Sequence, residues 1–367
     1  MHALVTADSI GGVWTYAREL VTGLCQRGLR VTLVSFGEIP TAAQTAWMDG
    51  LADLDFRPTA FQLEWMQGAE HDLALSRDYL QAVIRETAPD IIHLNQYCYG
   101  ALETDAPKIV VAHSDVMSWW VAVHGEEPRD TRWMRWYRDT VLAGLEGATA
   151  VVAPSQWMLD AIRLHYCSPA QARVIHNGRT PTLFNPHVTK EDYIVSVGRL
   201  WDGGKQTALL TRIHPPLPVY IAGSEQHPDA SLRNDSRRSA RKQVQFKGQL
   251  SEEQLRQLYS RAAIYAATSR YEPFGLAPLE AALSRCAIVA NDIPTFRELW
   301  GDSAFYFRYN DAASLQGALY RLAGDPEMRI AYANLAYQRA RECFTAERMV
   351  SDYLSLYQAL TKAEVAA

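Results

Sequence analysis

Short apolar segments alternate with amphipathic segments along almost the whole chain, and this alternation limits the fold more than any other feature. The apolar segments have the length of buried strands, and the segments between them carry apolar residues at helical spacing. Such alternation is typical of parallel βαβ units in an α/β fold. The expected strands are residues 3–6, 31–35, 91–94, 109–112, 150–153, 193–197, 219–222, 244–246, 264–267, 288–290 and 305–307.

The pattern is interrupted once and then restarts. Residues 180–190 contain Pro181 and Pro186 and few apolar side chains, which indicates a linker. We therefore expect two Rossmann-like parallel-sheet domains, residues 1–182 and residues 183–344. The remaining residues, 345–367, are expected to form a terminal helix. Its apolar stripe consists of Met349, Tyr353, Leu356, Tyr357 and Leu360.

Composition supports a globular protein of this size and excludes several other classes. The chain has 367 residues, enough for two domains with a core each, and 48% of them are hydrophobic. No apolar run approaches the roughly twenty residues of a membrane span, and the N-terminus predicts a first strand rather than a signal peptide. A formal net charge of −5 gives no support to nucleic-acid binding. Five scattered cysteines without a CxxC pair favour a reducing cytoplasm and no zinc site.

The segment from Ser269 to Ala281 contains the strongest functional signal. A buried strand precedes it, Pro273 and Gly275 break it, and a helix follows, so it lies at the carboxyl end of a parallel sheet. A helix N-terminus at such a place can hold a phosphate. Carboxylates on either side, Glu272 and Glu280, can accept hydrogen bonds from sugar hydroxyls. The pattern therefore predicts a nucleotide-sugar site.

The spacing from Glu272 to Glu280 resembles the E-x7-E motif of the retaining glycosyltransferases of family 4. The resemblance covers essentially the whole chain and implies the GT-B fold, in which two Rossmann-like domains face an interdomain cleft and a terminal helix crosses back to the first domain. It implies that Glu280 binds the ribose and Glu272 the donor sugar. The backbone of Phe274, Gly275 and Leu276 is then expected near the sugar or phosphate.

A second motif, Val197-Gly-Arg-Leu-Trp-Asp-Gly-Gly-Lys205, follows the first strand of the second domain. Its cations suit a diphosphate, because arginine binds phosphate through a fork of donors and lysine as a point charge. The segment is similar to the G-R-L-x-x-x-K-G element of the same family. By this resemblance Arg199 and Lys205 stabilise the departing diphosphate.

Two features of the first domain complete the predicted site. Gly11 and Gly12 open the first helix without forming GxGxxG, so a dinucleotide fingerprint is absent. In the family such glycines let the backbone approach the donor phosphate or the acceptor. His113 ends a strand, and its position resembles that of the family's cleft histidine, which implies that it faces the sugar.

Two other patterns carry less weight. Asp53-Leu-Asp55 has the spacing of a metal-binding DxD, but we place it at the end of an amphipathic helix and reject it as a metal site. No metal is expected, since cations and helix dipoles serve the diphosphate in GT-B enzymes of this kind. The basic run from Arg233 to Lys247 is expected to be a solvated helix, because its apolar face is too poor for membrane binding.

The function expected from the resemblance is that of a retaining, metal-independent hexosyltransferase in the cytoplasm. It would move a hexose from a UDP- or GDP-sugar to an acceptor hydroxyl in glycan, glycolipid or glycoside biosynthesis, and peripheral membrane contact stays open. The alternatives are a GT-B nucleotide-sugar epimerase-like enzyme and a catalytically inactive nucleotide-sugar-binding protein. The chain departs from the family after Asn177-Gly178, where Arg179-Thr-Pro181 replaces the usual apolar residue and aspartate.

Overall fold

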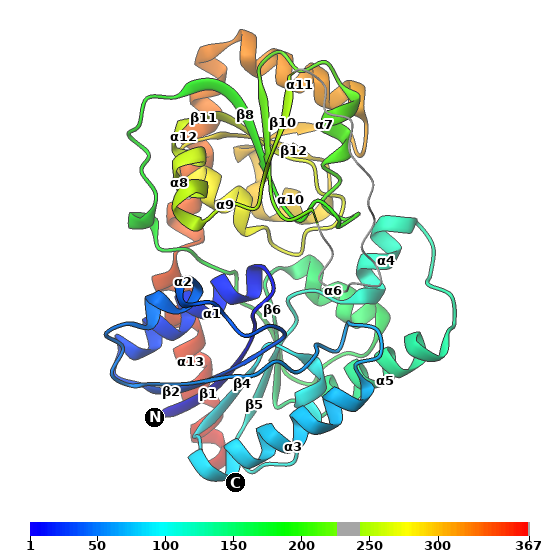
Figure 1. Cartoon of the computed structure of the whole chain (residues 1–367), viewed down its shortest axis with the longest axis vertical. Coiled ribbons are helices and arrows are strands. Elements are labelled where there is room, and N and C mark those ends of the chain that lie inside the picture. The colour runs from blue at the N-terminus through cyan, green and yellow to red at the C-terminus, as the bar shows by residue number, and fades with distance from the viewer. Residues whose placement is uncertain (226–242, 366–367) are drawn as a thin grey trace. The chain divides into compact units, whose positions relative to one another are not determined.

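The computed structural model describes residues 1–225 and 243–365, which group into two compact units (Figure 1). Unit 1 comprises residues 1–121, 126–178 and 346 onwards, and unit 2 comprises residues 122–125 and 179–345. Each unit is a parallel α/β domain, so the predicted fold class is confirmed. Most of the basic run that begins at Arg233 lies outside the described residues.

The sheet of unit 1 contains seven strands within the described residues, all parallel, in the order β3-β2-β1-β4-β5-β6-β7. Its central strands are buried on both faces and therefore read as continuous apolar runs in the sequence. The strands are β1 (His2–Asp8), β2 (Arg30–Phe36), β3 (Leu54–Pro58), β4 (Ile91–Leu94), β5 (Lys108–Val111), β6 (Ala150–Ala153) and β7 (Ala172–Val174).

Helices cover both faces of this sheet. One face packs against α1 (Gly12–Cys25) and α13 (Ala346–Val365), and the predicted apolar stripe of the terminal helix is buried there. The other face packs against α3 (Glu70–Thr87), α5 (Arg132–Glu146) and α6 (Gln156–His165). The shorter elements are α2 (Ala42–Thr45), η1 (Ala46–Met48), η2 (Tyr97–Ala101) and α4 (Val116–His124), the last of which ends in unit 2.

Unit 2 repeats the arrangement with six parallel strands among the described residues, in the order β10-β9-β8-β11-β12-β13. The strands are β8 (Glu191–Val197), β9 (Val219–Ala222), β10 (Val244–Gly248), β11 (Ala262–Ala267), β12 (Ala287–Asn291) and β13 (Phe305–Phe307). The helices are η3 (Pro181–Leu183), α7 (Ala208–Arg212), α8 (Glu252–Arg261), α9 (Leu276–Leu283), α10 (Pro294–Trp300), η5 (Gly301–Ser303), α11 (Ala312–Gly324) and α12 (Pro326–Cys343). A capping box formed by Ser251 and Gln254 begins α8.

The predicted strands are all present, but two more were missed and one assignment was wrong. β7 is short and only half-buried, and β3 lies at the edge of the sheet, so neither has a continuous apolar run. The Asp53-Leu-Asp55 segment enters β3 instead of ending a helix. Asp55 pairs with Arg57 at 2.8 Å, which is a structural ion pair.

Helix α3 ends in a backbone conformation that a non-glycine residue adopts at a cost. Ala88 follows the helix with φ 41° and ψ 63°, and its N–H donates to the Ile84 carbonyl at 2.9 Å. A left-handed cap of this kind favours glycine because a Cβ atom crowds the backbone. The side chain of Ala88 is exposed, so burial of its methyl group does not offset this cost.

We therefore expect Ala88→Gly to raise the free energy of unfolding by about 0.5–1 kcal/mol. The matched control is Ala82→Gly, at an exposed position inside the same helix, which should lower it by about 0.5–1 kcal/mol. Chemical denaturation of the full chain measures both. Equal losses of stability in the two variants would contradict the assignment of strain to Ala88.

Candidate active site

The sheet order of unit 2 places two loops side by side at one edge. β8 and β11 are hydrogen-bonded neighbours although β9 and β10 lie between them in the sequence, so the crossovers leave them in opposite directions. In open α/β sheets this switch point is where ligands bind, outside the carboxyl ends of the strands. The loop after β8 carries Arg199 and Lys205, and the loop after β11 carries Glu272.

A largely buried ion pair joins these two loops. The Lys205 Nζ atom lies 2.7 Å from both carboxylate oxygens of Glu272, and the two side chains are only 20% and 10% exposed. Ser269 donates a further hydrogen bond to Glu272 Oε2 at 2.9 Å. The pKa of the Tyr265 hydroxyl is raised, mainly by burial and secondly by the charge of the Glu272 carboxylate.

Backbone contacts hold the same two loops together. Thr268 Oγ1 donates to the Lys205 carbonyl at 2.9 Å, and the Arg270 N–H donates to the Gly204 carbonyl at 2.8 Å. Because these bonds flank the ion pair, Lys205 and Glu272 are fixed relative to each other by the main chain. Sequence reasoning identified the charged residues but missed Thr268 and Ser269, whose role depends on the pairing of the loops.

Arg199 has a counter-charge of its own. Its Nη2 atom lies 2.8 Å from Asp202 Oδ2, and its guanidinium lies over the Trp201 ring at 5.0 Å. Asp202 is only 4% exposed, and its other oxygen accepts from the Gly204 N–H at 2.8 Å. Arg199 itself is 41% exposed, so its guanidinium is accessible to a ligand. Sequence reasoning missed Asp202, because no motif marks it as the partner of Arg199.

Glycines allow the close approach of backbones at this edge. A Cβ atom on Gly223, which has φ +146°, would lie 1.8 Å from the Gly198 carbonyl oxygen. A Cβ atom on Gly275, with φ +92°, would lie 3.1 Å from Glu272 Cγ. Gly275 thus brings the start of α9 against Glu272, as the predicted strand–loop–helix requires. Gly223 was missed because it contributes only space.

The remaining residues predicted to bind the donor lie on and before α9. Glu280 is the fifth residue of α9, and Leu276 is the first. Phe274 is buried, with its ring 5.4 Å from that of Phe344, so only its backbone is available to a ligand. Glu280 pairs through Oε1 with Nε of the buried Arg179 at 3.0 Å. The Glu280 charge, after burial, raises the pKa of Tyr259.

In unit 1 the predicted residues follow β1 and β5. Gly11 precedes α1 with φ 100°, and no side chain caps the helix, which begins at Gly12. His113 lies two residues after β5, with its ring 4.5 Å from that of Tyr16. Its Nε2 atom lies 2.8 Å from Asn95 Oδ1.

Hydrogen bonding defines the protonation of His113. Asn95 Nδ2 donates to the Thr6 carbonyl at 2.6 Å, so the amide oxygen faces His113 and can only accept. Nε2 of His113 therefore carries a proton, and Nδ1 is the acceptor. Burial lowers the pKa of His113 to about 3, so the ring is neutral at physiological pH. Such a ring accepts hydrogen bonds well but is a poor general base.

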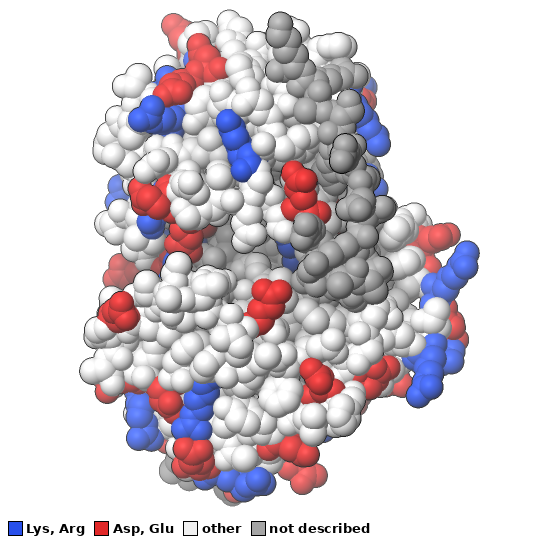
Figure 2. Space-filling view, in the orientation of Figure 1, with Lys and Arg blue, Asp and Glu red and all other residues white. Residues whose placement is uncertain are grey.

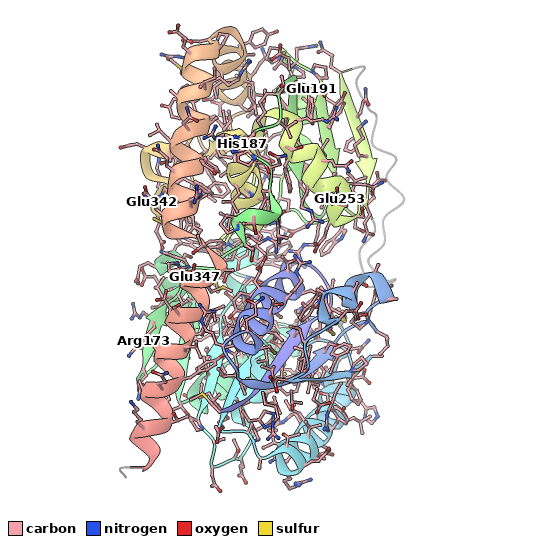
Figure 3. The ribbon with its side chains drawn as sticks, turned by 90° about the vertical axis from the view of Figure 1, so that its left-hand side faces the viewer. Arg173, His187, Glu191, Glu253, Glu342 and Glu347 are labelled. Atoms are coloured by element: carbon pink, nitrogen blue, oxygen red, sulfur yellow. The ribbon has the colours of Figure 1, made fainter. Side chains whose placement is uncertain are left out.

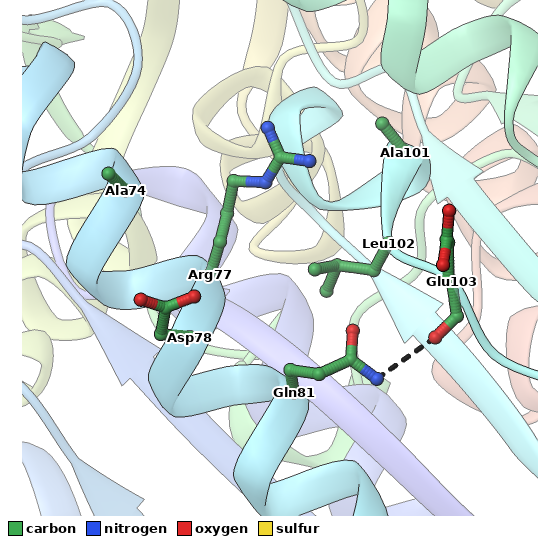
Figure 4. Close-up of a pocket in the computed structure, with 7 residues that line it drawn as sticks. All are labelled: Ala74, Arg77, Asp78, Gln81, Ala101, Leu102 and Glu103. Atoms are coloured by element: carbon green, nitrogen blue, oxygen red, sulfur yellow. Dashed lines mark hydrogen bonds between the residues drawn. The ribbon is translucent and has the colours of Figure 1, made fainter.

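Other surface features do not compete with this site. The described residues contain no group of three or more His, Cys, Asp or Glu side chains arranged to hold a metal. Nor does any helix in the described ranges have the length and apolarity needed to cross a membrane. On the face drawn in Figure 2, acidic and basic side chains of the described residues are interspersed. A pocket of about 410 Å³ contains none of the predicted site residues (Figure 4). Its lining is Ala74, Arg77, Asp78, Gln81, Ala101, Leu102 and Glu103.

Solved structures share this architecture. The sucrose-phosphate synthase of Thermosynechococcus elongatus superposes with a TM-score of 0.78 at 20% identity over 99% of each chain. HepE of Anabaena, solved in complex with UDP-glucose, gives 0.74 at 15% identity over 98% of this chain and 100% of that one. The two Rossmann-like sheets thus define a GT-B fold.

Sequence comparison then identifies the family. Residues 10–183 match Glycosyltransferase Family 4, and residues 184–339 match Glycosyl transferases group 1. The chain is 23% identical over 334 residues to the alpha-maltose-1-phosphate synthase of Mycolicibacterium smegmatis, covering 80% of this chain and 85% of that protein. It is 36% identical over 104 residues to the lipopolysaccharide core biosynthesis mannosyltransferase LpcC of Rhizobium leguminosarum, 28% of this chain and 30% of that one. The chain belongs to the family 4 glycosyltransferases.

The state of His113 leads to a direct prediction. Because its pKa is lowered to about 3, the ring should stay neutral from about pH 8 to pH 5, in the Nε2–H form. Asn95→Asp should raise the pKa of His113 by about 1–3 units, because a carboxylate then faces Nε2. NMR of the histidine rings, with His113 assigned by the signal lost in His113→Gln, measures the pKa of His113 in wild type and in Asn95→Asp. A wild-type midpoint near 6.5 would contradict the neutral state of the ring.

Proposed function

We propose that this glycosyltransferase moves a hexose from a nucleotide diphosphate sugar to an acceptor hydroxyl and retains the anomeric configuration. The observation that carries the proposal is the contact of Lys205 with Glu272 at the switch point of unit 2. It joins a phosphate-binding cation to a carboxylate suited to sugar hydroxyls. HepE, which shares the fold, was solved with UDP-glucose, and this supports a nucleotide sugar as the donor.

Roles are assigned to residues as the family resemblance implies. Arg199 and Lys205 stabilise the diphosphate, Glu272 binds the donor sugar, and Glu280 binds the ribose. The backbone from Phe274 through Gly275 to Leu276 lies near the sugar or phosphate. From unit 1, His113 contacts the sugar as a neutral acceptor, and Gly11 and Gly12 allow the backbone to approach the donor phosphate or acceptor.

The proposed reaction needs no covalent intermediate. The bond between the anomeric carbon and the diphosphate oxygen breaks, and the acceptor oxygen bonds to the same face of that carbon. The acceptor proton passes to an oxygen of the departing β-phosphate. Arg199 and Lys205 stabilise the negative charge that develops on the diphosphate, a contribution that grows as water is excluded. We propose that these cations serve in place of a metal ion.

Turnover of nucleotide sugars tests this function. The full chain is incubated with UDP-, GDP- and ADP-hexoses, with and without EDTA, and release of the nucleoside diphosphate is measured with and without candidate acceptors. We expect one donor to be used selectively, at a rate that EDTA does not change. Loss of turnover in EDTA would contradict metal independence, and absence of turnover with every donor would contradict the function.

Lys205→Ala and Glu272→Ala should each lower turnover by about 100-fold or more, because each removes a group that stabilises the transition state. The matched controls are Lys362→Ala and Glu253→Ala, which remove exposed charges from α13 and α8. Both controls should keep wild-type turnover. Wild-type rates in Lys205→Ala and Glu272→Ala, with the fold intact by circular dichroism, would refute the role assignment.

A further inference from the structure

We propose that Arg179 is a positioning residue that holds the Glu280 carboxylate ready for the ribose hydroxyls of the donor. The inference rests on the proposed function, since it takes Glu280 as the ribose-binding group. Arg179 also stands where the family resemblance implies an apolar side chain. An apolar side chain there could not pair with Glu280.

The contact is a buried ion pair within unit 2. Arg179 Nε lies 3.0 Å from Glu280 Oε1, and the side chains are 3% and 14% exposed. The guanidinium also lies 5.5 Å from the centre of the Phe184 ring. A buried guanidinium requires a counter-charge, because removing it from water without one is strongly unfavourable. The pair therefore supplies the counter-charge that Arg179 requires and limits the rotamers of Glu280.

The backbone of Arg179 is fixed as well. Its N–H donates to the Phe344 carbonyl at 3.0 Å, and it forms a parallel bridge with Thr345. The chain passes from unit 1 to unit 2 at Gly178–Arg179, and it returns after Thr345, between Glu342 and Glu347 in Figure 3. The Arg179 backbone thus joins the crossing at residues 178–179 to the one at residues 345–346, and its side chain contacts Glu280.

This arrangement orients the Glu280 carboxylate, a hydrogen-bond acceptor, before the nucleotide binds. A carboxylate binds the ribose hydroxyls best when it is ionised and already oriented, because less freedom is lost on binding. α9 supplies the backbone position of Glu280, and the contact with Arg179 contributes to the orientation of its carboxylate. Loss of Arg179 would leave a largely buried carboxylate without this partner, and its selectivity for a hydroxyl-bearing sugar would fall.

The preference for ribose over 2′-deoxyribose measures this role. Calorimetry compares the nucleoside diphosphate that binds wild type with its 2′-deoxy analogue. Wild type should prefer the ribo form by about 10-fold or more, as expected for a hydrogen bond to a charged group. Glu280→Ala and Arg179→Met should each bring the preference close to one. The double variant should lose no more than either single variant, because the two residues act as a unit.

The control is Arg261→Met, which removes an arginine–glutamate pair of 2.9 Å from the surface of the same unit and should keep the wild-type preference. If Arg179→Met does not fold, Arg179→Gln replaces it, with the same expected loss. Full ribose preference in a folded Arg179 variant would overturn the inference and leave the proposed function standing. Equal wild-type affinity for both forms would overturn it too. Wild type that binds no nucleoside diphosphate would refute the function, and the inference with it.

Discussion

The ion pair between Lys205 and Glu272 is the interaction on which the rest of the site depends. It forms because the crossovers of unit 2 bring β8 and β11 together, so that two loops distant in sequence end at the same edge. Gly275 lets α9 begin against Glu272, and Thr268 binds the Lys205 carbonyl. Since the main chain fixes both loops, a ligand meets a cation and a carboxylate whose separation is set before it binds.

Charge compensation is the common feature of the proposed donor site. Arg179, Arg199 and Lys205 each lie beside a carboxylate in this structure. For a buried pair such as that of Arg179 with Glu280, removal of one partner costs roughly 3–5 kcal/mol in measured cases. A diphosphate that binds here therefore exchanges one counter-charge for another. Arg199, the most exposed of these three cations, can make this exchange with the least rearrangement, whereas Arg179 is suited to stay with Glu280.

Much of this was predictable because its causes are local. Continuous apolar runs marked the strands that are buried on both faces, and Pro273 and Gly275 marked the loop that carries Glu272. Strands β3 and β7 were not predicted, because their edge position and partial burial remove the continuous apolar run from the sequence. The roles of four other residues were not predicted, for a different reason: Asp202, Ser269, Gly223 and Arg179. Their roles arise from contacts between segments far apart in sequence, and no spacing rule in one chain reveals which loops the sheet order will join. The sequence therefore predicted which charged residues belong to the site, but not which residues they contact.

The most direct measurement is the affinity of a free nucleoside diphosphate for wild type and for Glu272→Gln. We expect Lys205 to contact both Glu272 and the diphosphate. The Glu272 carboxylate then repels the diphosphate, and Glu272 favours binding only when the donor sugar is present. Glutamine keeps the shape and removes the charge, so calorimetry should show tighter binding of the sugar-free diphosphate. The same variant should still be impaired in turnover. Weaker or unchanged affinity would contradict the claim that the diphosphate and Glu272 share Lys205.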